Sequence, residues 1–339
     1  MSEERFKWLR KWCLDPKEDI IATTGCESNV KEIYDKCNEL NADPKNVIFN
    51  QFCEFGNVLI HYLCTGHAVA TVFESIRAKK NPGAKLSTFV SATGSGGTLA
   101  TGDYLKDRYG TKIAAVEAVE CPTLLYNGFG GHNIQGIGDK HVPYIHNVMN
   151  TDYVVGISDA NTDNLVALFN TEEGKKYLVD KKGFNPDFIE SLKTLGISSI
   201  CNILAAIKVA RYHNLGPDDY LFTCATDSAQ MYGSEVQKAV GKYFLGKFDS
   251  YSAAEVYGRY LLGVGTDHLK ELTHQDRKAI FNLGYFTWVE QQGVDLKDFA
   301  ARMQPAFWKN LLRFPGIWDG LIESFNQQSG VFHKILKKV

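Results

Sequence analysis

The pattern that decides the fold lies in residues 86–119, which read LSTFVSATGSGGTLATGDYLKDRYGTKIAAVEAV. The apolar run over 86–92 predicts a strand, and a glycine-rich turn follows it. A helix is predicted from Thr98 to about Arg108, and a second apolar strand over 112–119. Strand, helix and strand in this order form a right-handed crossover between parallel strands, whose sheet is covered by helices. We therefore predict an α/β fold with a mostly parallel sheet and helices on both faces.

The same periodicities predict the elements on either side of this unit. Further strands are expected over 19–24, 47–52, 153–157 and 220–224, and helices over 58–77, 159–170, 172–180 and 196–212. Ser28 is predicted to cap a helix that follows it, and Ser198 or Ser199 to cap the helix over 196–212. After about Leu245 strand-like runs disappear and aromatic residues become dense. We expect a helical extension there, packed on the α/β body or forming a subunit interface.

The composition indicates an ordinary globular protein. Of its 339 residues 44% are hydrophobic and 22% charged, and the net charge of −2 gives no basic excess for nucleic acid or an anionic membrane surface. No apolar run approaches the ~18 residues of a membrane span, and the charged N-terminus lacks a secretory signal. The eight cysteines form no C-x-x-C pair, so neither a zinc site nor a disulfide scaffold is expected. A cytoplasmic location is the expectation that follows.

Residues 94–98, Gly-Ser-Gly-Gly-Thr, form the strongest local motif. Glycines allow a positive φ and a close approach of backbone amides to a ligand. The helix that begins near Thr98 presents free N–H groups and its positive dipole end to the loop. The loop therefore suits an anion such as phosphate, with Ser95 and Thr98 as additional donors, although a tight turn without a ligand fits the same residues.

Several other functions require motifs that this sequence lacks. A dinucleotide loop needs G-x-G-x-x-G, but position 99 is Leu, and a G-x-S-x-G elbow fails because position 93 is Thr. Neither a Walker loop nor H-E-x-x-H occurs. These absences weigh against a NAD enzyme, an NTPase, a serine hydrolase and a metalloprotease, and no metal site is expected.

At this point the chain resembles a known family. Gly94–Thr98 is similar to the phosphate loop of cysteine synthase and the other fold-type II pyridoxal-phosphate enzymes. Further segments resemble the family in the same order, over about residues 19–240: Asn50–Phe52, Ile60–Tyr62 with Thr65 and Gly66, His132–Gly138, Gly196–Ser199, Ala205–Ala210, and Thr226–Ser228 with Tyr232. The resemblance implies a three-layer α/β domain over 57–245, a remnant of the small N-terminal domain over 1–56, and a helical extension over 246–339.

The resemblance also implies the cofactor and its contacts. Pyridoxal 5′-phosphate would be held at its phosphate by Gly94, Ser95, Gly96, Gly97 and Thr98, and at its pyridine nitrogen by Thr226 or Asp227. The amino-acid substrate would be bound by Gln51, Gln135 and Gly136. A carboxylate at the ring nitrogen would strengthen the ring as an electron sink, whereas a hydroxyl would keep the neutral arrangement, and a one-residue slip exchanges the two. A homodimer is a further assembly that the resemblance allows.

One departure from the family bears on activity. The family attaches its cofactor to a lysine in an S-x-K-x-R-like segment, and a second, Asn-containing glycine loop binds the substrate carboxylate. Neither occurs in this chain, so we expect upstream sequence to be missing. Lys79, Lys80 and Lys208 are expected to lie in solvent, away from the cofactor. The Schiff-base lysine therefore stays unknown.

Three hypotheses remain open. The chain has the family's chemistry, β-elimination or β-replacement on an amino acid such as O-acetylserine. Alternatively it is a catalytically impaired phosphate-binding fragment or pseudoenzyme, since the lysine performs transimination and proton transfer. In the third hypothesis a separate chain supplies the lysine segment.

Overall fold

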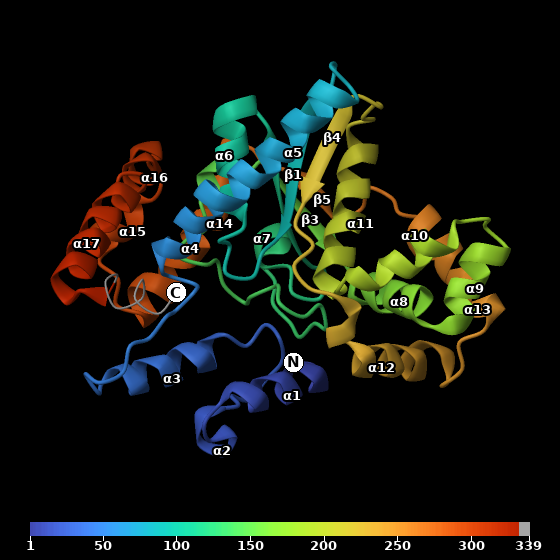
Figure 1. The fold of residues 1–339 in the computed structure, drawn as a ribbon, viewed down its shortest axis with the longest axis horizontal. Coiled ribbons are helices and arrows are strands. Elements are labelled where there is room, and N and C mark those ends of the chain that lie inside the picture. The colour runs from blue at the N-terminus through green and yellow to red at the C-terminus, as the bar shows by residue number, and fades with distance from the viewer. Residues whose placement is uncertain (332–339) are drawn as a thin grey trace.

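A five-stranded sheet runs through the centre of the computed structural model, which describes residues 1–331 (Figure 1). Its strands are β1 (Lys85–Ala92), β2 (Lys112–Ala118), β3 (Tyr153–Ile157), β4 (Asp219–Thr223) and β5 (Leu269–Glu271). Their order is β4-β1-β2-β3-β5, with four parallel strands and β5 antiparallel against β3. The predicted α/β class is confirmed. The expectation that strands end at about Leu245 is wrong, because the short β5 closes the β3 edge.

The central strands are apolar throughout because both of their faces are buried. In β2, Ala114 and Val116 point into one hydrophobic core, and Ile113 and Ala115 into another. Alternate residues of a strand point to opposite faces, so these two cores lie on the two sides of the sheet.

Helices cover both faces (Figure 1). On the first face α11 (Ile197–Tyr212) packs against β1, β3 and β4, with α8 (Asp159–Asn170) and α12 (Gly233–Phe244) outside it. On the second face α6 (Leu99–Tyr109) packs against β1 and β2. The predicted helix over 58–77 is one helical run formed by α4 (Phe55–Ile60), a π-helical turn η1 (His61–Thr65) and α5 (Gly66–Lys79).

Shorter elements connect these layers. They are α7 (Thr123–Tyr126), η2 (Val148–Asn150), α9 (Glu172–Asp180), α10 (Pro186–Ser191), η3 (Leu192–Thr194) and η4 (Ala229–Met231). The predicted strand over 153–157 and the helices over 159–170 and 172–180 have the bounds that the sequence indicates.

The N-terminal segment differs from its prediction. It contains α1 (Glu3–Trp12), α2 (Pro16–Asp19) and α3 (Lys31–Asn41), and neither 20–24 nor 47–52 forms a strand. Ser28 does not cap α3: Val30 occupies the cap position without a side-chain bond, and the buried Ser28 hydroxyl donates to the Gly130 carbonyl at 2.6 Å. Short apolar runs form strands only where a sheet edge is available to pair with them.

The C-terminal extension packs on the α/β body as expected for most of its length, first against α8 and α9 on the first face and then, from α14 (His274–Tyr285), on the second face. It contains α13 (Ser250–Val256), η5 (Tyr257–Leu262), α14 (His274–Tyr285), η6 (Phe286–Gln291), α15 (Leu296–Ala301), α16 (Pro305–Leu311) and α17 (Phe314–Ser329). Phe281, Trp288 and Phe299 are buried in the core that also contains Ile113 and Val154 of the sheet. Residues 332–339 of the predicted extension lie outside the described residues.

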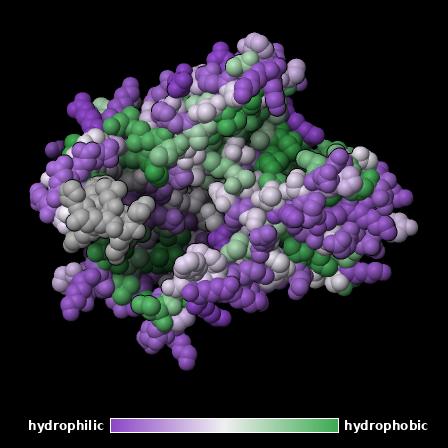
Figure 2. All heavy atoms as spheres, in the orientation of Figure 1, coloured by the Kyte–Doolittle hydropathy of each residue, from purple (hydrophilic) through white to green (hydrophobic). Residues whose placement is uncertain are grey.

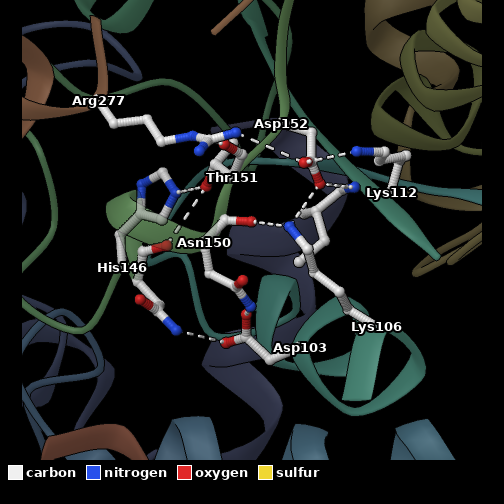
Figure 3. A network of polar contacts seen from close by, with 10 residues as sticks. Asp103, Lys106, Lys112, His146, Asn150, Thr151, Asp152 and Arg277 are labelled. Atoms are coloured by element: carbon white, nitrogen blue, oxygen red, sulfur yellow. Dashed lines mark hydrogen bonds and ion pairs between the residues drawn. The ribbon is translucent and has the colours of Figure 1, made fainter. Parts of the chain in front are cut away.

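A polar junction fastens this extension to the sheet (Figure 3). The buried Asp152 carboxylate, just before β3, accepts from the Ile113 amide at 2.9 Å and from Lys106 of α6 at 2.7 Å. Arg277 of α14 lies 3.5 Å from the same carboxylate and donates to the Thr151 carbonyl at 2.6 Å. A single carboxylate thus links α6, β2, β3 and α14.

Helix α17 does not follow the packing prediction. It buries no side chain, and its apolar residues recur at helical spacing on an exposed face. These residues, each between 41% and 67% exposed, are Phe314, Ile317, Trp318, Leu321, Ile322 and Phe325.

Two further findings concern the whole described chain. No single helix among residues 1–331 is long and apolar enough to cross a membrane; the stretches 186–194 and 197–212 pass such a test only together, across a bend of 114°. All eight cysteines are free thiols, as expected from their scattered positions.

The extension's packing generates a prediction. A chain that ends at Lys247 should aggregate on expression, because it loses the residues that cover Ile113 and Val154. A chain that ends at Arg313 should stay soluble, since it lacks only α17, which buries no side chain, and the residues after it. Size-exclusion chromatography of both chains tests this. A soluble, equally stable chain ending at Lys247 would refute it.

Candidate functional site

A cavity of about 540 Å³ opens at the carboxyl ends of the parallel strands. Loops that follow β1, β2 and β4 meet there, as the topology requires for parallel strands. The space-filling view shows a hollow between the N-terminal segment and the α/β body (Figure 2). The loops contribute Gly94, Ser95, Gly96, Thr98, Gly136, Ile137, Asp139 and Thr226 to the cavity wall, and Gln51 and Ser198 also line it.

The glycine loop lies at the end of β1, where the sequence predicts it. Gly96 has φ +84°, and a side chain there would meet His146 Cβ at 3.2 Å, so the position requires glycine twice over. The loop is fixed from both sides: Ser91 and Thr98 share a hydrogen bond of 2.7 Å, and Asn57 donates to the Ser95 hydroxyl at 3.0 Å. Helix α6, 11 residues long, starts at Leu99 with its N-terminus toward the loop.

A second loop touches the first through the backbone alone. The Gly138 amide donates to the Thr93 carbonyl at 2.6 Å, and a Cβ on Gly94 would lie 2.8 Å from the Gly136 carbonyl oxygen. Gly136 and Gly138 have φ of +83° and +77°. His132 lies buried and donates from Nε2 to the Gly138 carbonyl at 2.9 Å.

The third wall comes from α11 and the end of β4. Ser198 and Thr226 share a hydrogen bond of 3.0 Å at the cavity. Neither Ser198 nor Ser199 caps α11, because Gly196 holds the cap position without a side-chain bond. Asn202 joins the two strands at this wall: its Oδ1 accepts from the Ala92 amide at 2.8 Å and its Nδ2 donates to the Cys224 carbonyl at 3.2 Å.

Thr226 and Asp227, which the sequence leaves as alternatives, point in different directions. Thr226 lines the cavity. Asp227 pairs with Arg5 of α1 at 2.5 Å, and Tyr232 donates to the same carboxylate oxygen. Arg5 also donates to the Tyr232 hydroxyl at 2.6 Å. The structure therefore places the hydroxyl, and not the carboxylate, at the cavity.

Three other candidates differ in their placement. Gln51 is exposed and lines the cavity. Gln135 is buried outside it, where its Oε1 accepts from the Ser2 amide at 2.9 Å. Gly97 lies behind the loop against Asn57 and does not line the cavity.

Of the described residues that line the cavity, none is a lysine. Lys79 and Lys80 are exposed, as predicted. Lys208 does not line the cavity, but the expectation that it lies in solvent is wrong. Its side chain is buried and donates to the Asp267 carbonyl at 2.7 Å and to the Asp267 carboxylate at 3.0 Å. Six residues of helix, about 9 Å, separate Lys208 from Asn202 at the cavity wall.

Residues 142–146 form a layer between the glycine loop and the extension. His146 lies against Gly96, while Trp288 donates to the Val142 carbonyl at 2.7 Å. Arg302 is buried, donates to the Tyr144 carbonyl and lies 4.0 Å from the centre of the Tyr144 ring. Burial lowers the pKa of Arg302 to about 10. The extension thus holds the segment on which the glycine loop rests.

Sequence reasoning missed Asn57, Asn202 and Asp139. The only local signal for Asn202 is a carboxamide in the apolar run ISSICNILAAIKVA, residues 197–210. Among residues 1–331 no group of three or more His, Cys, Asp or Glu side chains is placed to hold a metal ion.

Comparison with known proteins gives the wider context. No family model matches the chain. Cysteine synthase B of Campylobacter jejuni is 28% identical over 215 residues, 62% of each chain. A probable cysteine synthase of Bacillus subtilis is 26% identical over 235 residues, 68% of this chain and 66% of that protein. The chain is a distant homologue of the cysteine synthases.

The solved structures agree on the fold. A hydrogen sulfide-producing enzyme of Fusobacterium nucleatum, solved as a point mutant with an alpha-aminoacrylate intermediate, superposes with a TM-score of 0.56 at 21% identity. The match covers 81% of this chain and 69% of that one. This cysteine synthase-like family depends on pyridoxal phosphate. The chain spans 62% of the length of the Campylobacter relative.

The position of His146 behind the glycine loop predicts how acid affects stability. Burial, and next to it the charge of Arg302, lower the pKa of His146 from 6.5 to about 3. Below pH 6.5 this histidine is therefore protonated in the unfolded chain but stays neutral in the folded chain. The free energy of unfolding consequently falls as the pH falls from 6.5 toward 3. Between pH 7.5 and pH 5 this residue should account for a loss of about 2 kcal/mol.

Urea unfolding of wild type and His146→Gln at the two pH values measures that loss. The variant should lose about 2 kcal/mol less than wild type. His274→Gln, which changes an exposed histidine of α14, is the control and should behave as wild type. Equal losses in wild type and His146→Gln would show that His146 does not cause the acid sensitivity.

Proposed function

We propose that the cavity binds pyridoxal 5′-phosphate and that the chain derives from enzymes that catalyse β-elimination or β-replacement on an amino acid such as O-acetylserine. The observation that carries the proposal is the meeting of the glycine loop, Gly136 and the Ser198–Thr226 pair around one cavity. Its volume of about 540 Å³ suits a cofactor together with a small substrate. The distant homology to cysteine synthases supports the same assignment.

The residues at the cavity fit this cofactor. Glycines at 94 and 96 let the loop pack closely against its neighbours, because a Cβ would meet the Gly136 carbonyl at 94 and His146 at 96. The N-terminus of α6 favours an anion. Ser95 and Thr98 add hydroxyl groups, and Gly97 keeps the loop against Asn57. At the opposite wall, Thr226 offers a neutral hydrogen bond to a ring nitrogen, with Ser198 beside it. Asp227 takes no part, because Arg5 neutralises it.

Bound pyridoxal phosphate supplies an electron sink for a carbanion at the substrate's α-carbon. The protein's own residues bind and orient. The loop over 94–98 fixes the phosphate, Thr226 leaves the ring nitrogen neutral, and Gln51 lies at the exposed side of the cavity, where it suits a substrate carboxylate. Gln135 lies outside the cavity and supports its wall by accepting a hydrogen bond from the Ser2 amide. Gly136 lines the cavity without placing a side chain in it.

The alternative is a catalytically impaired phosphate-binding protein. Its support is the lack of a lysine among the described residues of the cavity wall. A lysine amine makes the covalent link and transfers the α-proton in such chemistry, so residues 1–331 alone hold the cofactor without that group.

Further parts of the proposal follow from the same assignment. The cofactor-binding part corresponds to residues 57–245, with a small-domain segment over 1–56 and the extension over 246–339. An amino acid is the proposed small-molecule partner, a homodimer the proposed assembly, and the cytoplasm the proposed location.

The phosphate assignment is tested at Gly96. Gly96→Val should weaken binding of pyridoxal phosphate at least tenfold, because the position has a positive φ and a Cβ there meets His146. Equilibrium dialysis gives the dissociation constant. Gly110→Val is the matched control: Gly110 also has a positive φ, +72°, but ends α6 in open space. Equal affinity in wild type and Gly96→Val would reject the site.

Borohydride reduction tests whether any lysine of the chain forms a covalent adduct with pyridoxal phosphate. Purified chain mixed with pyridoxal phosphate and reduced with borohydride should yield no single labelled lysine by peptide mass spectrometry. It should also form little cysteine from O-acetylserine and sulfide. A stoichiometric adduct at one lysine together with rapid turnover would show that this chain is a complete enzyme.

A further inference from the structure

The cavity wall contains a buried acid, and one of its oxygens has no partner among residues 1–331. The Asp139 side chain is 8% exposed, and its Oδ2 atom is buried without a hydrogen-bond partner among the described residues. Asp139 lines both the main cavity and a small hollow of about 10 Å³ beneath it. Buried polar atoms are nearly always paired, so an unpaired carboxyl at a cavity wall indicates a partner that the ligand supplies.

The surrounding groups are already occupied. Glu117, across the small hollow, accepts from the Leu124 and Leu125 amides at 2.9 and 2.7 Å. His141 shares a hydrogen bond of 2.8 Å with the Tyr34 hydroxyl. The main chain of Asp139 is fixed as well, since its carbonyl accepts from Thr123 at 2.6 Å. The backbone of Asp139 is therefore fixed, while its carboxyl group remains available to a ligand in the cavity.

Burial favours the protonated, neutral form of this carboxyl group, and that form can donate a hydrogen bond. Burial raises the pKa of Asp139 well above its usual range, and no charged group among the described residues counters this effect. A protonated carboxyl carries an O–H and presents it to an acceptor. A ligand atom that only accepts hydrogen bonds therefore suits this position.

Asp139 lies toward the substrate side of the cavity. His141, two residues after Asp139, shares a hydrogen bond of 2.8 Å with the Tyr34 hydroxyl. The Tyr34 ring packs against Phe52 at 5.6 Å, next to Gln51 in the chain. The wall that would face the pyridine nitrogen is built from Thr226 and Ser198, which belong to other elements. If the cofactor's phosphate lies at the glycine loop and its ring nitrogen at Thr226, Asp139 faces neither group. It is then free to contact the amino acid that is joined to the cofactor.

We propose that Asp139 is the specificity-determining residue that donates a hydrogen bond to an oxygen on the β-carbon of the bound amino acid, so that the site selects substrates of the serine-ether or serine-ester class. The proposal rests on the proposed function, because it needs the cofactor's phosphate at residues 94–98.

Two stable conjugates isolate this contact. N-phosphopyridoxyl-O-methyl-L-serine carries an ether oxygen next to the β-carbon, which only accepts. N-phosphopyridoxyl-L-norvaline has a methylene in its place and otherwise the same shape. Isothermal titration calorimetry of each with the full chain gives a preference ratio that requires no turnover. One neutral hydrogen bond should favour the ether about fivefold in wild type.

Substitutions at Asp139 test whether this residue causes the preference for the ether conjugate. Asp139→Ala should bind both conjugates equally, whereas Asp139→Asn, which keeps an N–H donor, should retain the preference. Asp139→Ala should fold with a thermal midpoint at least that of wild type, since it removes an unsatisfied buried group. Glu27→Gln changes another acid at the cavity wall and should leave the ratio at its wild-type value.

The outcomes separate the two proposals. Binding of both conjugates without a preference in wild type, or a preference that persists in Asp139→Ala, would overturn the role of Asp139 and leave the phosphate site standing. Absence of binding by either conjugate would overturn the proposed function and the role of Asp139 with it. A preference lost in Asp139→Ala and kept in Asp139→Asn and Glu27→Gln supports the assignment.

Discussion

The site depends on a close backbone contact between two loops. Gly94 approaches the Gly136 carbonyl so closely that a Cβ would intrude, and the Gly138 amide donates to Thr93 at 2.6 Å. Glycine is the residue that permits both the approach and the positive φ values found at 96, 136 and 138. The loop over 93–98 is fixed at the end of β1, and the loop over 132–138 is held by His132 and by the layer over 142–146. Because the two loops contact each other, the position of one cavity wall determines that of the other.

The extension is part of this arrangement. Trp288 and Arg302 hold residues 142–146 from outside, and His146 of that layer lies against Gly96. Arg302 is a buried cation that contacts carbonyls and aromatic rings, so its desolvation is offset by π faces and backbone acceptors. Asp152 and Arg277 fix the same extension at the opposite ends of the strands. The described helices after Leu245, up to residue 331, therefore support the cavity without lining it.

The sequence predicts the parts of the fold whose signals are local. Apolar runs between turns define β1 to β4, and the glycines of 94–97 identify the anion loop. It fails where the outcome depends on distant partners. The runs over 19–24 and 47–52 have strand composition but pair with none of the described strands. Lys208 is buried because Asp267 reaches it from 59 residues away. The roles of Asp139 and Asn202 could not be predicted for the same reason, because their surroundings are formed by several elements that are distant in the sequence. Between Thr226 and Asp227 the decision comes from Arg5, which lies 222 residues from Asp227.

The strand order has a consequence for how the chain folds. Strands β1, β2 and β3 follow one another within residues 85–157, but the other edge of β1 pairs with β4, whose residues 219–223 come much later. During synthesis a nascent chain therefore carries β1 with one side of its ladder open while more than a hundred residues are still to be made. Parallel pairing over such separations closes large loops and is slow, and an open apolar edge invites association with other chains. Recombinant yield should thus depend on translation speed and on chaperones that shield β1 until β4 emerges.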